Sequence, residues 1–178
     1  MTFGAPEHLE TLIGACDEKA AEFGYCAAWL VDAERRIRGF SSVPVPERLR
    51  PALWAHNAIG SPSSVVVRRS LWECAGGFDE WLEPFGHWDL WVRWSRCARM
   101  CMSSEPTVAQ AIGEHSGEAL ARELRELRRR YGGDAKADGV RFGAARAGAP
   151  EAALDGSPRP PWLVEAMTAA GSVDTPER

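Results

Sequence analysis

Apolar residues at the start of the chain first recur every three or four positions and then run together without interruption. The first pattern predicts a helix over Glu7–Phe23 that Gly24 closes. Its apolar face comprises Leu9, Leu12, Ile13, Cys16 and Ala20. The uninterrupted run Tyr25–Val31 is typical of a buried strand, and Ile37–Phe40 is predicted to return as a second, short strand.

The middle of the chain alternates proline-rich stretches with short segments that have a regular pattern. Prolines predict an extended connection over residues 41–51. A β-branched run then predicts a strand over Ser64–Arg68. Residues 70–75 are predicted to form a short helix, with Ser70 as its N-cap and Glu73 as the capping-box partner.

Further along, the helical period returns and alternates with short apolar runs. A helix is predicted over Gly86–Ala98, followed by strands at Met100–Met102 and Val108–Ile112. A charged helix with a leucine stripe is predicted over Gly117–Tyr131. Strands that alternate with helices in this way indicate an α/β fold over residues 1–131.

The last part of the chain has a different composition. Residues 132–178 number 47, of which 7 are Gly, 11 Ala and 5 Pro. With so few large apolar residues, this segment is predicted to be a flexible, disordered tail. Only the segment Pro161–Met167 is apolar enough for a short helix that docks on the rest of the protein.

Length and charge narrow the class of protein. The chain has 178 residues, room for one domain, and a formal net charge of −4. That charge argues against a nucleic-acid coat or a polybasic membrane binder, because both need surplus cations. The N-terminus does not resemble a signal peptide, and no apolar run is long enough to span a membrane. A cytoplasmic protein is therefore predicted.

The cysteines do not form a disulfide framework. They number five, an odd count without paired spacing. Cys97 and Cys101 are four residues apart, which on a helix would place both on one face. Two thiols at that spacing supply half a zinc site at most, so buried reduced thiols are predicted instead.

Two polar side chains stand out at the start of the helix predicted from Gly86. His87 lies where the positive end of the helix dipole disfavours imidazolium, so a neutral ring able to accept a proton is one interpretation. A capping or partly buried, hydrogen-bonded histidine is the other. Asp89 and Arg93 form an acid–base pair at i,i+4, which is expected to stabilise the helix.

The run from residue 63 to residue 95 resembles the acceptor-side half of family 2 glycosyltransferases of the GT-A fold. Those enzymes carry a strand that ends in Arg-Arg, a G-G-F-D-E turn, and an acidic pair followed by W-D-L-W-x-R. The matching pieces here are Val65–Arg69, Gly76–Glu80 and Trp88–Arg93. The resemblance covers about residues 5–131 and implies a partial GT-A fold, the acceptor half of a mixed sheet flanked by helices.

The resemblance also implies a reaction, the inverting transfer of a sugar from a nucleotide-diphosphate donor to a glycan or other hydroxyl acceptor. In the family, Mg or Mn held by a D-x-D motif neutralises the departing diphosphate. This chain has no D-x-D, and Asp32-Ala33-Glu34 falls where the family has a turn. The nucleotide-binding half that carries the motif is therefore expected to be missing, and the chain alone to be inactive.

The catalytic base of the family is the Asp of the acidic pair just before W-D-L-W. The corresponding positions here are Gly86 and His87. His87 is a candidate replacement, because imidazole suits proton abstraction at neutral pH. Loss of the Asp equally fits a non-catalytic pseudoenzyme or a carbohydrate-binding module.

Three neighbouring residues and one distant histidine complete the candidates. Asp79 and Glu80 are predicted either to approach the acceptor or to be solvated loop charges. Trp81 is the candidate for stacking on a sugar ring, whereas Trp88 and Trp91 are expected in the core. His115 is a weak metal candidate, because one histidine without carboxylate partners cannot hold a metal well.

Overall fold

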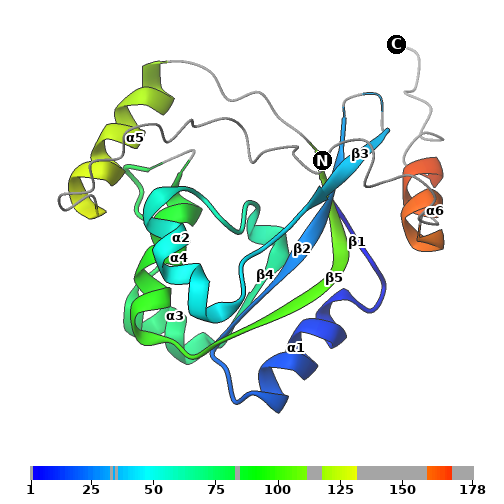
Figure 1. Cartoon of the computed structure of the whole chain (residues 1–178), viewed down its shortest axis with the longest axis horizontal. Helices are drawn as coiled ribbons and strands as arrows, with labels where there is room; N and C mark the ends of the chain where they lie inside the picture. The colour runs from blue at the N-terminus through cyan, green and yellow to red at the C-terminus, as the bar shows by residue number, and fades with distance from the viewer. Residues whose placement is uncertain are drawn as a thin grey trace, which may run out of the picture.

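A computed structural model of the chain describes residues 2–32, 34, 36–82, 85–111, 118–131 and 160–169. Within this part, five strands form one mixed sheet flanked by helices, so the α/β prediction is confirmed (Figure 1). The strands are β1 (Thr2–Gly4), β2 (Phe23–Val31), β3 (Ile37–Ser41), β4 (Val65–Val67) and β5 (Met100–Ala111).

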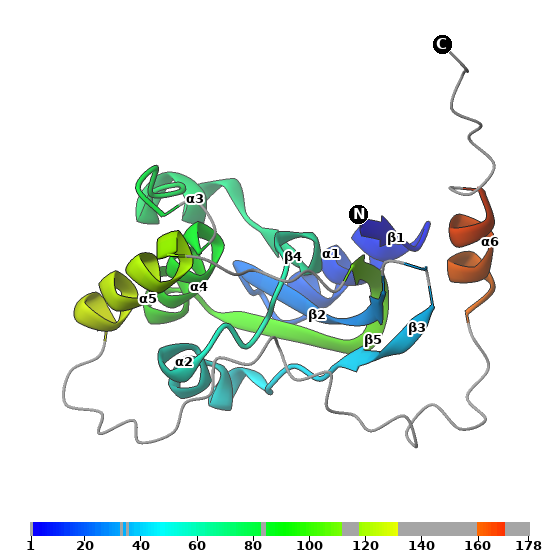
Figure 2. The same ribbon diagram turned by 90° about the horizontal axis from the view of Figure 1, so that it is seen from above.

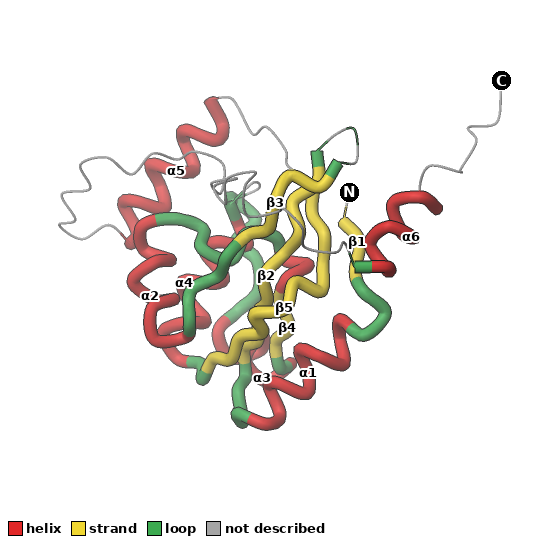
Figure 3. Tube along the Cα trace, turned by 45° about the vertical axis from the view of Figure 1, so that its right-hand side comes forward, coloured by secondary structure: helices red, strands yellow, loops and turns green. Residues whose placement is uncertain are grey.

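Strand β2 is the centre of the sheet. All nine of its residues are buried, as its uninterrupted apolar run predicts. It pairs in parallel with β5, and antiparallel with both β3 and β4 on its other edge. Strand β1 extends the sheet beyond β5 (Figure 3).

Strand β5 corrects the prediction of two separate short strands. It is one strand of 12 residues that ends at Ala111. Its register with β2 shifts between Cys26 and Ala28, opposite the polar segment of β5 that carries Pro106. The polar segment interrupts the apolar pattern while the backbone stays extended. The pattern therefore predicts two strands where the structure has one.

Helix α1 (His8–Glu18) covers one face of the sheet and is shorter than predicted. It packs Leu12 against Cys26, Ala28 and Val108. The predicted helix end at Phe23 is wrong, because Ala20 adopts a left-handed backbone with φ of 49° and the chain turns into β2.

Helix α2 (Pro46–Ala55) replaces the extended connection predicted over 41–51. Pro46 stands at the helix start, where its missing N–H costs nothing. Pro51 lies inside the helix and removes one backbone hydrogen bond. Leu49 and Leu53 are fully buried one turn apart, and their burial in the core outweighs that loss.

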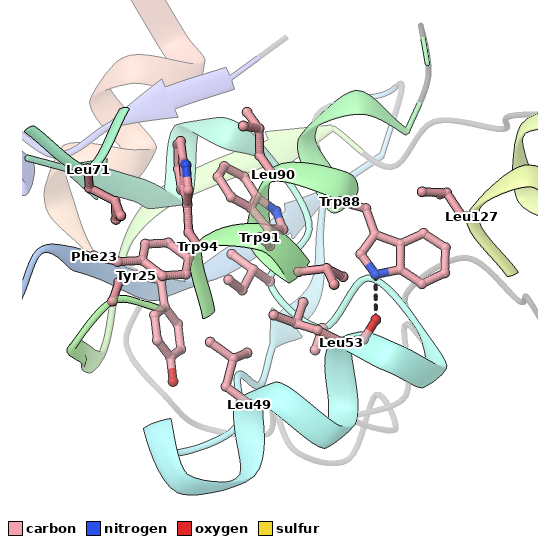
Figure 4. Packing of buried hydrophobic residues seen from close by; sticks show 14 of the residues in the cluster. Phe23, Tyr25, Leu49, Leu53, Leu71, Trp88, Leu90, Trp91, Trp94 and Leu127 are labelled. Atoms are coloured by element: carbon pink, nitrogen blue, oxygen red, sulfur yellow. Dashed lines mark hydrogen bonds between the residues drawn. The ribbon is translucent and has the colours of Figure 1, made fainter. Parts of the chain in front are cut away.

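The main core lies on the sheet face opposite α1, between α2, α3 (Arg69–Ala75) and α4 (Gly86–Cys97). Figure 4 shows Trp91 and Trp94 beside Phe23, and the Trp88 indole N–H donating to the Leu53 carbonyl oxygen at 2.7 Å. The prediction that Trp88 and Trp91 are core residues is confirmed. The predicted capping box at Ser70 is wrong, because α3 begins one residue earlier and has no side-chain cap.

Two helices follow β5 along the chain. Helix α5 (Glu118–Tyr131) adds Leu127 to the main core, and helix α6 (Pro161–Ala169) lies at the other end of the sheet (Figure 2). Leu163 of α6 is fully buried against Trp29, Val31 and Ala109, which confirms a docking helix within the predicted tail. The rest of residues 132–178 lies outside the described residues.

The prediction of buried reduced thiols is confirmed for Cys101 and is wrong for Cys97. Cys97 ends α4 and is exposed, whereas Cys101 is buried in β5, so the two do not share a helix face. The turn prediction at Asp32 is confirmed, since the carboxylates of Asp32 and Glu34 both bind the Arg36 guanidinium. No helix among the described residues is long and apolar enough to cross a membrane.

Candidate active site

His87 lies in the first turn of α4 and faces the loop that follows α2. The Asn57 side-chain nitrogen is 2.9 Å from His87 Nε2. The same Asn57 amide forms a closed pair with Gly60: its Nδ2 donates to the Gly60 carbonyl, and its Oδ1 accepts from the Gly60 N–H, both at 3.0 Å. Gly60 has a φ of 88°, a backbone that favours glycine.

The Gly60 pair decides which atom of Asn57 meets the histidine. Turning the amide over would break both bonds to Gly60, so Nδ2 is the atom that faces His87. A donor at that position requires Nε2 of His87 to accept. The geometry therefore favours a neutral imidazole with its proton on Nδ1, and the Nε2 lone pair is directed at Asn57.

The turn at residues 76–81 lies against the start of α4. Gly76 ends α3 with a φ of 77°, which confirms the predicted helix stop. Gly77 passes so close to Trp72 that an added Cβ would lie 2.8 Å from the indole ring. At Gly86 an added Cβ would lie 3.5 Å from the Phe78 ring, an ordinary contact, so close packing alone does not require a glycine here.

Asp89 and Arg93 join the two motifs of the resemblance into one unit. Asp89 is 1% exposed, and its carboxylate accepts from Arg93 Nε at 2.7 Å, which confirms the predicted i,i+4 pair. The Arg93 guanidinium then donates to the carbonyl oxygens of Ala75, at 2.5 Å, and Gly77, at 2.6 Å. Arg93 thus holds the end of α3 and the Gly-Gly turn against α4.

Helix α5 closes the same network from the other side. The Tyr131 hydroxyl donates to Asp89 Oδ1 at 2.5 Å, and Arg130 donates to Asp79 Oδ2 at 2.5 Å. Burial, together with the Asp89 carboxylate, raises the pKa of Tyr131 well above its usual range. The Arg130 hydrogen bond holds the pKa of Asp79 below its ordinary value.

The three residues predicted to contact the acceptor differ in their hydrogen bonds and in their exposure to solvent. Asp79 is engaged, because its second oxygen accepts from the Trp81 N–H at 2.9 Å while the first binds Arg130. Glu80 is exposed. Trp81 is 86% exposed, which leaves its ring face open for contact with a ligand.

A carboxylate that the sequence reasoning missed also reaches this site. Glu123 of α5 is 4% exposed, and one of its oxygens accepts from the N–H of Phe85, the residue before α4, at 3.3 Å. Its sequence signal is weak: it stands one turn before the buried Leu127 but within a run of charged residues. Glu123 therefore brings its carboxylate to the positive end of α4, at Phe85, which is two residues before His87.

The site holds no metal ligand set. Among the described residues, no three His, Cys, Asp or Glu side chains group closely enough to bind a metal ion. The carboxylates of Asp79 and Asp89 are already taken by arginines. The described residues therefore do not fit the Mg or Mn that the resemblance implies. His115 lies outside the described residues.

Comparison with known proteins does not assign this chain to a family. No family model matches this sequence, and no curated protein matches it at a significant level.

Proposed function

We propose that this chain supplies the acceptor side of an inverting glycosyltransferase, with His87 at the position of the catalytic base. The donor would be a nucleotide-diphosphate sugar, and the acceptor a glycan or another hydroxyl compound. The diphosphate and its metal would be held by a nucleotide-binding half that this chain does not contain. A cytoplasmic location for the protein is part of the same proposal.

The observation that carries the proposal is the way Arg93 joins the two motifs. The G-G-F-D-E and W-D-L-W-V-R pieces are the specific part of the resemblance, and they lie against each other through the guanidinium of Arg93. Contact between the two pieces is what the resemblance requires, because both belong to the acceptor side of the family's site. This unit sets the orientation of α4 and, with it, the position of His87.

The proposed role of His87 is to take the proton of the acceptor hydroxyl. The hydroxyl oxygen then bonds to the anomeric carbon while the bond to the diphosphate breaks, and the proton stays on Nε2. Asn57 now donates to that nitrogen, so the acceptor hydroxyl has to replace Asn57 as the hydrogen-bond donor. The proposed role of Trp81, which is 86% exposed, is to contact the ring of a sugar acceptor.

The same hydrogen bond supports the alternative, a non-catalytic carbohydrate-binding module. An imidazole whose lone pair is directed at a fixed amide is a poor base, and Gly86 provides no carboxylate to replace it. In this alternative, Trp81 binds sugar and no bond is broken.

One experiment separates a longer enzyme from an independent module. The DNA upstream of the codon for Met1 is read for an open frame, or a neighbouring gene, that encodes a strand ending in D-x-D. If it is present, the combined protein is assayed for release of nucleoside diphosphate from a set of nucleotide sugars. A stop codon close upstream, with no neighbouring gene for that half, contradicts the enzyme proposal.

The role of His87 is tested in that combined protein. His87→Ala is expected to lower kcat at least ~100-fold, the low end of the contribution of a general base. His56→Ala is the matched control, because His56 is an exposed histidine beside Asn57 and is expected to leave kcat unchanged. An unchanged kcat in His87→Ala refutes the base role.

Sugar binding is tested on the chain itself with a glycan array and tryptophan fluorescence. Trp81→Ala is expected to abolish glycan binding, whereas Trp54→Ala, which removes another exposed indole, is expected to retain it. Glycan binding without any transfer activity in the combined protein would favour the carbohydrate-binding alternative. Equal glycan binding by the two variants would show that Trp81 does not belong to the sugar-binding site.

A further inference from the structure

Two cysteine thiols meet under helix α1, away from the candidate active site. Cys16 of α1 and Cys101 of β5 are 85 residues apart in the sequence, yet their Sγ atoms lie 3.2 Å apart. Both side chains are buried. The pair packs with Ala21 in a small apolar cluster between the helix and the sheet.

A glycine makes room for this pair. Gly24 of β2 lies directly opposite Cys101 in the sheet. A Cβ at residue 24 would lie 2.5 Å from the Sγ of Cys16 and 3.2 Å from the Sγ of Cys101. Glycine weakens the interior of a strand, so its presence in the central strand is explained by the space that the two sulfurs occupy.

The two thiols differ in their access to solvent molecules. A small pocket of about 80 Å³ between α1 and β4 is lined by Ile13, Cys16, Asp17 and Val66–Arg68. That volume admits a molecule of the size of water or peroxide. Cys101 is not among the residues that line this pocket, and burial raises its pKa to about 12. Cys16 is therefore the thiol that a small oxidant meets first.

We propose that Cys16 and Cys101 are a redox pair that a hydroperoxide converts to a disulfide joining α1 to β5. The Cys16 sulfur attacks the peroxide O–O bond, becomes a sulfenic acid and releases water or an alcohol. The Cys101 sulfur then attacks the sulfenic sulfur, the S–O bond breaks, and a second water leaves. Two thiols lose two electrons in total, and the peroxide takes them up.

The disulfide would restrain a long stretch of chain. It would tie the first helix of the protein to a strand that lies 85 residues further on. Cross-links over loops of this length stabilise the folded state, chiefly by restricting the unfolded chain. The oxidised protein is expected to melt on the order of 5–10 °C above the reduced protein. The proposal is independent of sugar transfer.

The test uses the full chain with Cys74→Ser and Cys97→Ser, which removes the two exposed thiols. The reduced protein is treated with hydrogen peroxide while folded, then denatured and alkylated. The alkylated cysteines are expected to fall from three to one, Cys26, and peptide mapping should find Cys16 linked to Cys101. Three alkylated cysteines after oxidation, or a link through Cys26, would overturn the proposal.

The order of the two steps is tested by adding Cys101→Ser to this protein. With the second thiol absent, the sulfenic acid on Cys16 should persist and react with dimedone. Cys16→Ser is the matched variant, and its Cys101 should give no dimedone adduct. The mapping in the parent protein remains decisive if either variant fails to fold. An oxidised parent that melts at the same temperature as the reduced form contradicts the stabilising role.

Discussion

At the scale of single residues, two glycines of this protein are expected to behave in opposite ways. Gly24 is crowded by Cys16, Val66 and Cys101, whereas Gly14, on the exposed side of α1, has nothing within 4 Å of an added Cβ. The first glycine is required by close packing. The second only lowers the stability of the helix.

We expect Gly24→Ala to destabilise the protein by about 1–3 kcal/mol, because the added methyl overpacks the cluster around the two sulfurs. Gly14→Ala is the matched substitution, and it is expected to stabilise the protein by about 0.5–1 kcal/mol through helix propensity. Urea unfolding of the reduced proteins measures both changes. A Gly24→Ala protein as stable as the parent would mean that the sulfurs do not lie over residue 24.

At the scale of elements, the contacts of α4 decide whether the turn at residues 76–81 keeps its place. Arg93 is the connecting side chain, since it binds Asp89 within α4 and the carbonyl oxygens at the end of α3. Its removal would leave the buried Asp89 carboxylate without its closest positive charge. The Tyr131 hydroxyl and the more distant Arg130, whose Nη1 lies 3.6 Å from Asp89 Oδ1, balance that charge only in part.

We therefore expect Arg93→Ala to cost about 3–5 kcal/mol of unfolding free energy, the range for removing one partner of a buried ion pair. Arg96→Ala, which removes an exposed arginine from the same helix, is expected to change stability by less than about 0.5 kcal/mol. Arg93→Lys should lie between the parent and the alanine variant, because an ammonium keeps a positive charge for Asp89 but cannot also reach the carbonyls. Equal stabilities of Arg93→Ala and Arg96→Ala would contradict the connecting role.

The contacts of α5 are expected to weaken in acid. Hydrogen bonds from Arg129 and Arg130 lower the pKa of Glu126 from 4.5 to about 2, and the Arg130 hydrogen bond also lowers that of Asp79. A carboxyl group whose pKa is lower in the folded state contributes stability at neutral pH. That contribution is lost as the pH falls through the folded-state pKa. The loss is therefore expected between about pH 4.5 and pH 2.

The measurement is the free energy of unfolding at neutral and acidic pH. Arg130→Met removes the arginine that Asp79 and Glu126 share, while Glu126 keeps Arg129, so its stability should change less with pH across this range than that of the parent. Arg125→Met, which removes another exposed arginine of α5, should keep the pH dependence of the parent. The same pH dependence in both variants would show that Arg130 does not link α5 to the turn.

At the scale of the whole molecule, α1 covers the sheet but leaves apolar surface in contact with water. Leu9 and Ile13 were predicted on its apolar face together with Leu12 and Cys16. The structure buries only the latter two, while Leu9 is 60% and Ile13 51% exposed. Leu9 and Ile13 are one helical turn apart and so form a continuous exposed stripe.

We expect this stripe to promote self-association, because two adjacent apolar side chains exposed on one helix face can pack against the same face of a second molecule. The double variant Leu9→Glu, Ile13→Glu should increase the monomer fraction in size-exclusion chromatography with light scattering. Val45→Glu, at another exposed apolar residue, is the control and should leave that fraction unchanged. A parent protein that is monomeric at all concentrations and unfolds cooperatively would contradict the prediction.

The sequence by itself determined those elements whose pattern is local. The apolar run of β2, the helical period of α4 and α5, and the glycine that ends α3 depend only on residues a few positions apart. The motif block also identified the part of the chain that folds into one hydrogen-bonded unit around Arg93.

Only the tertiary structure decided the rest. Helix α2 forms despite the internal Pro51 because Leu49 and Leu53 reach the core. Asp79 is neutralised by Arg130, 51 residues away, and Cys16 meets Cys101, 85 residues away. Such partners leave no periodic signal in the sequence, because they come together only when distant elements pack. Whether a carboxylate or a thiol is free to react therefore depends on the fold as a whole.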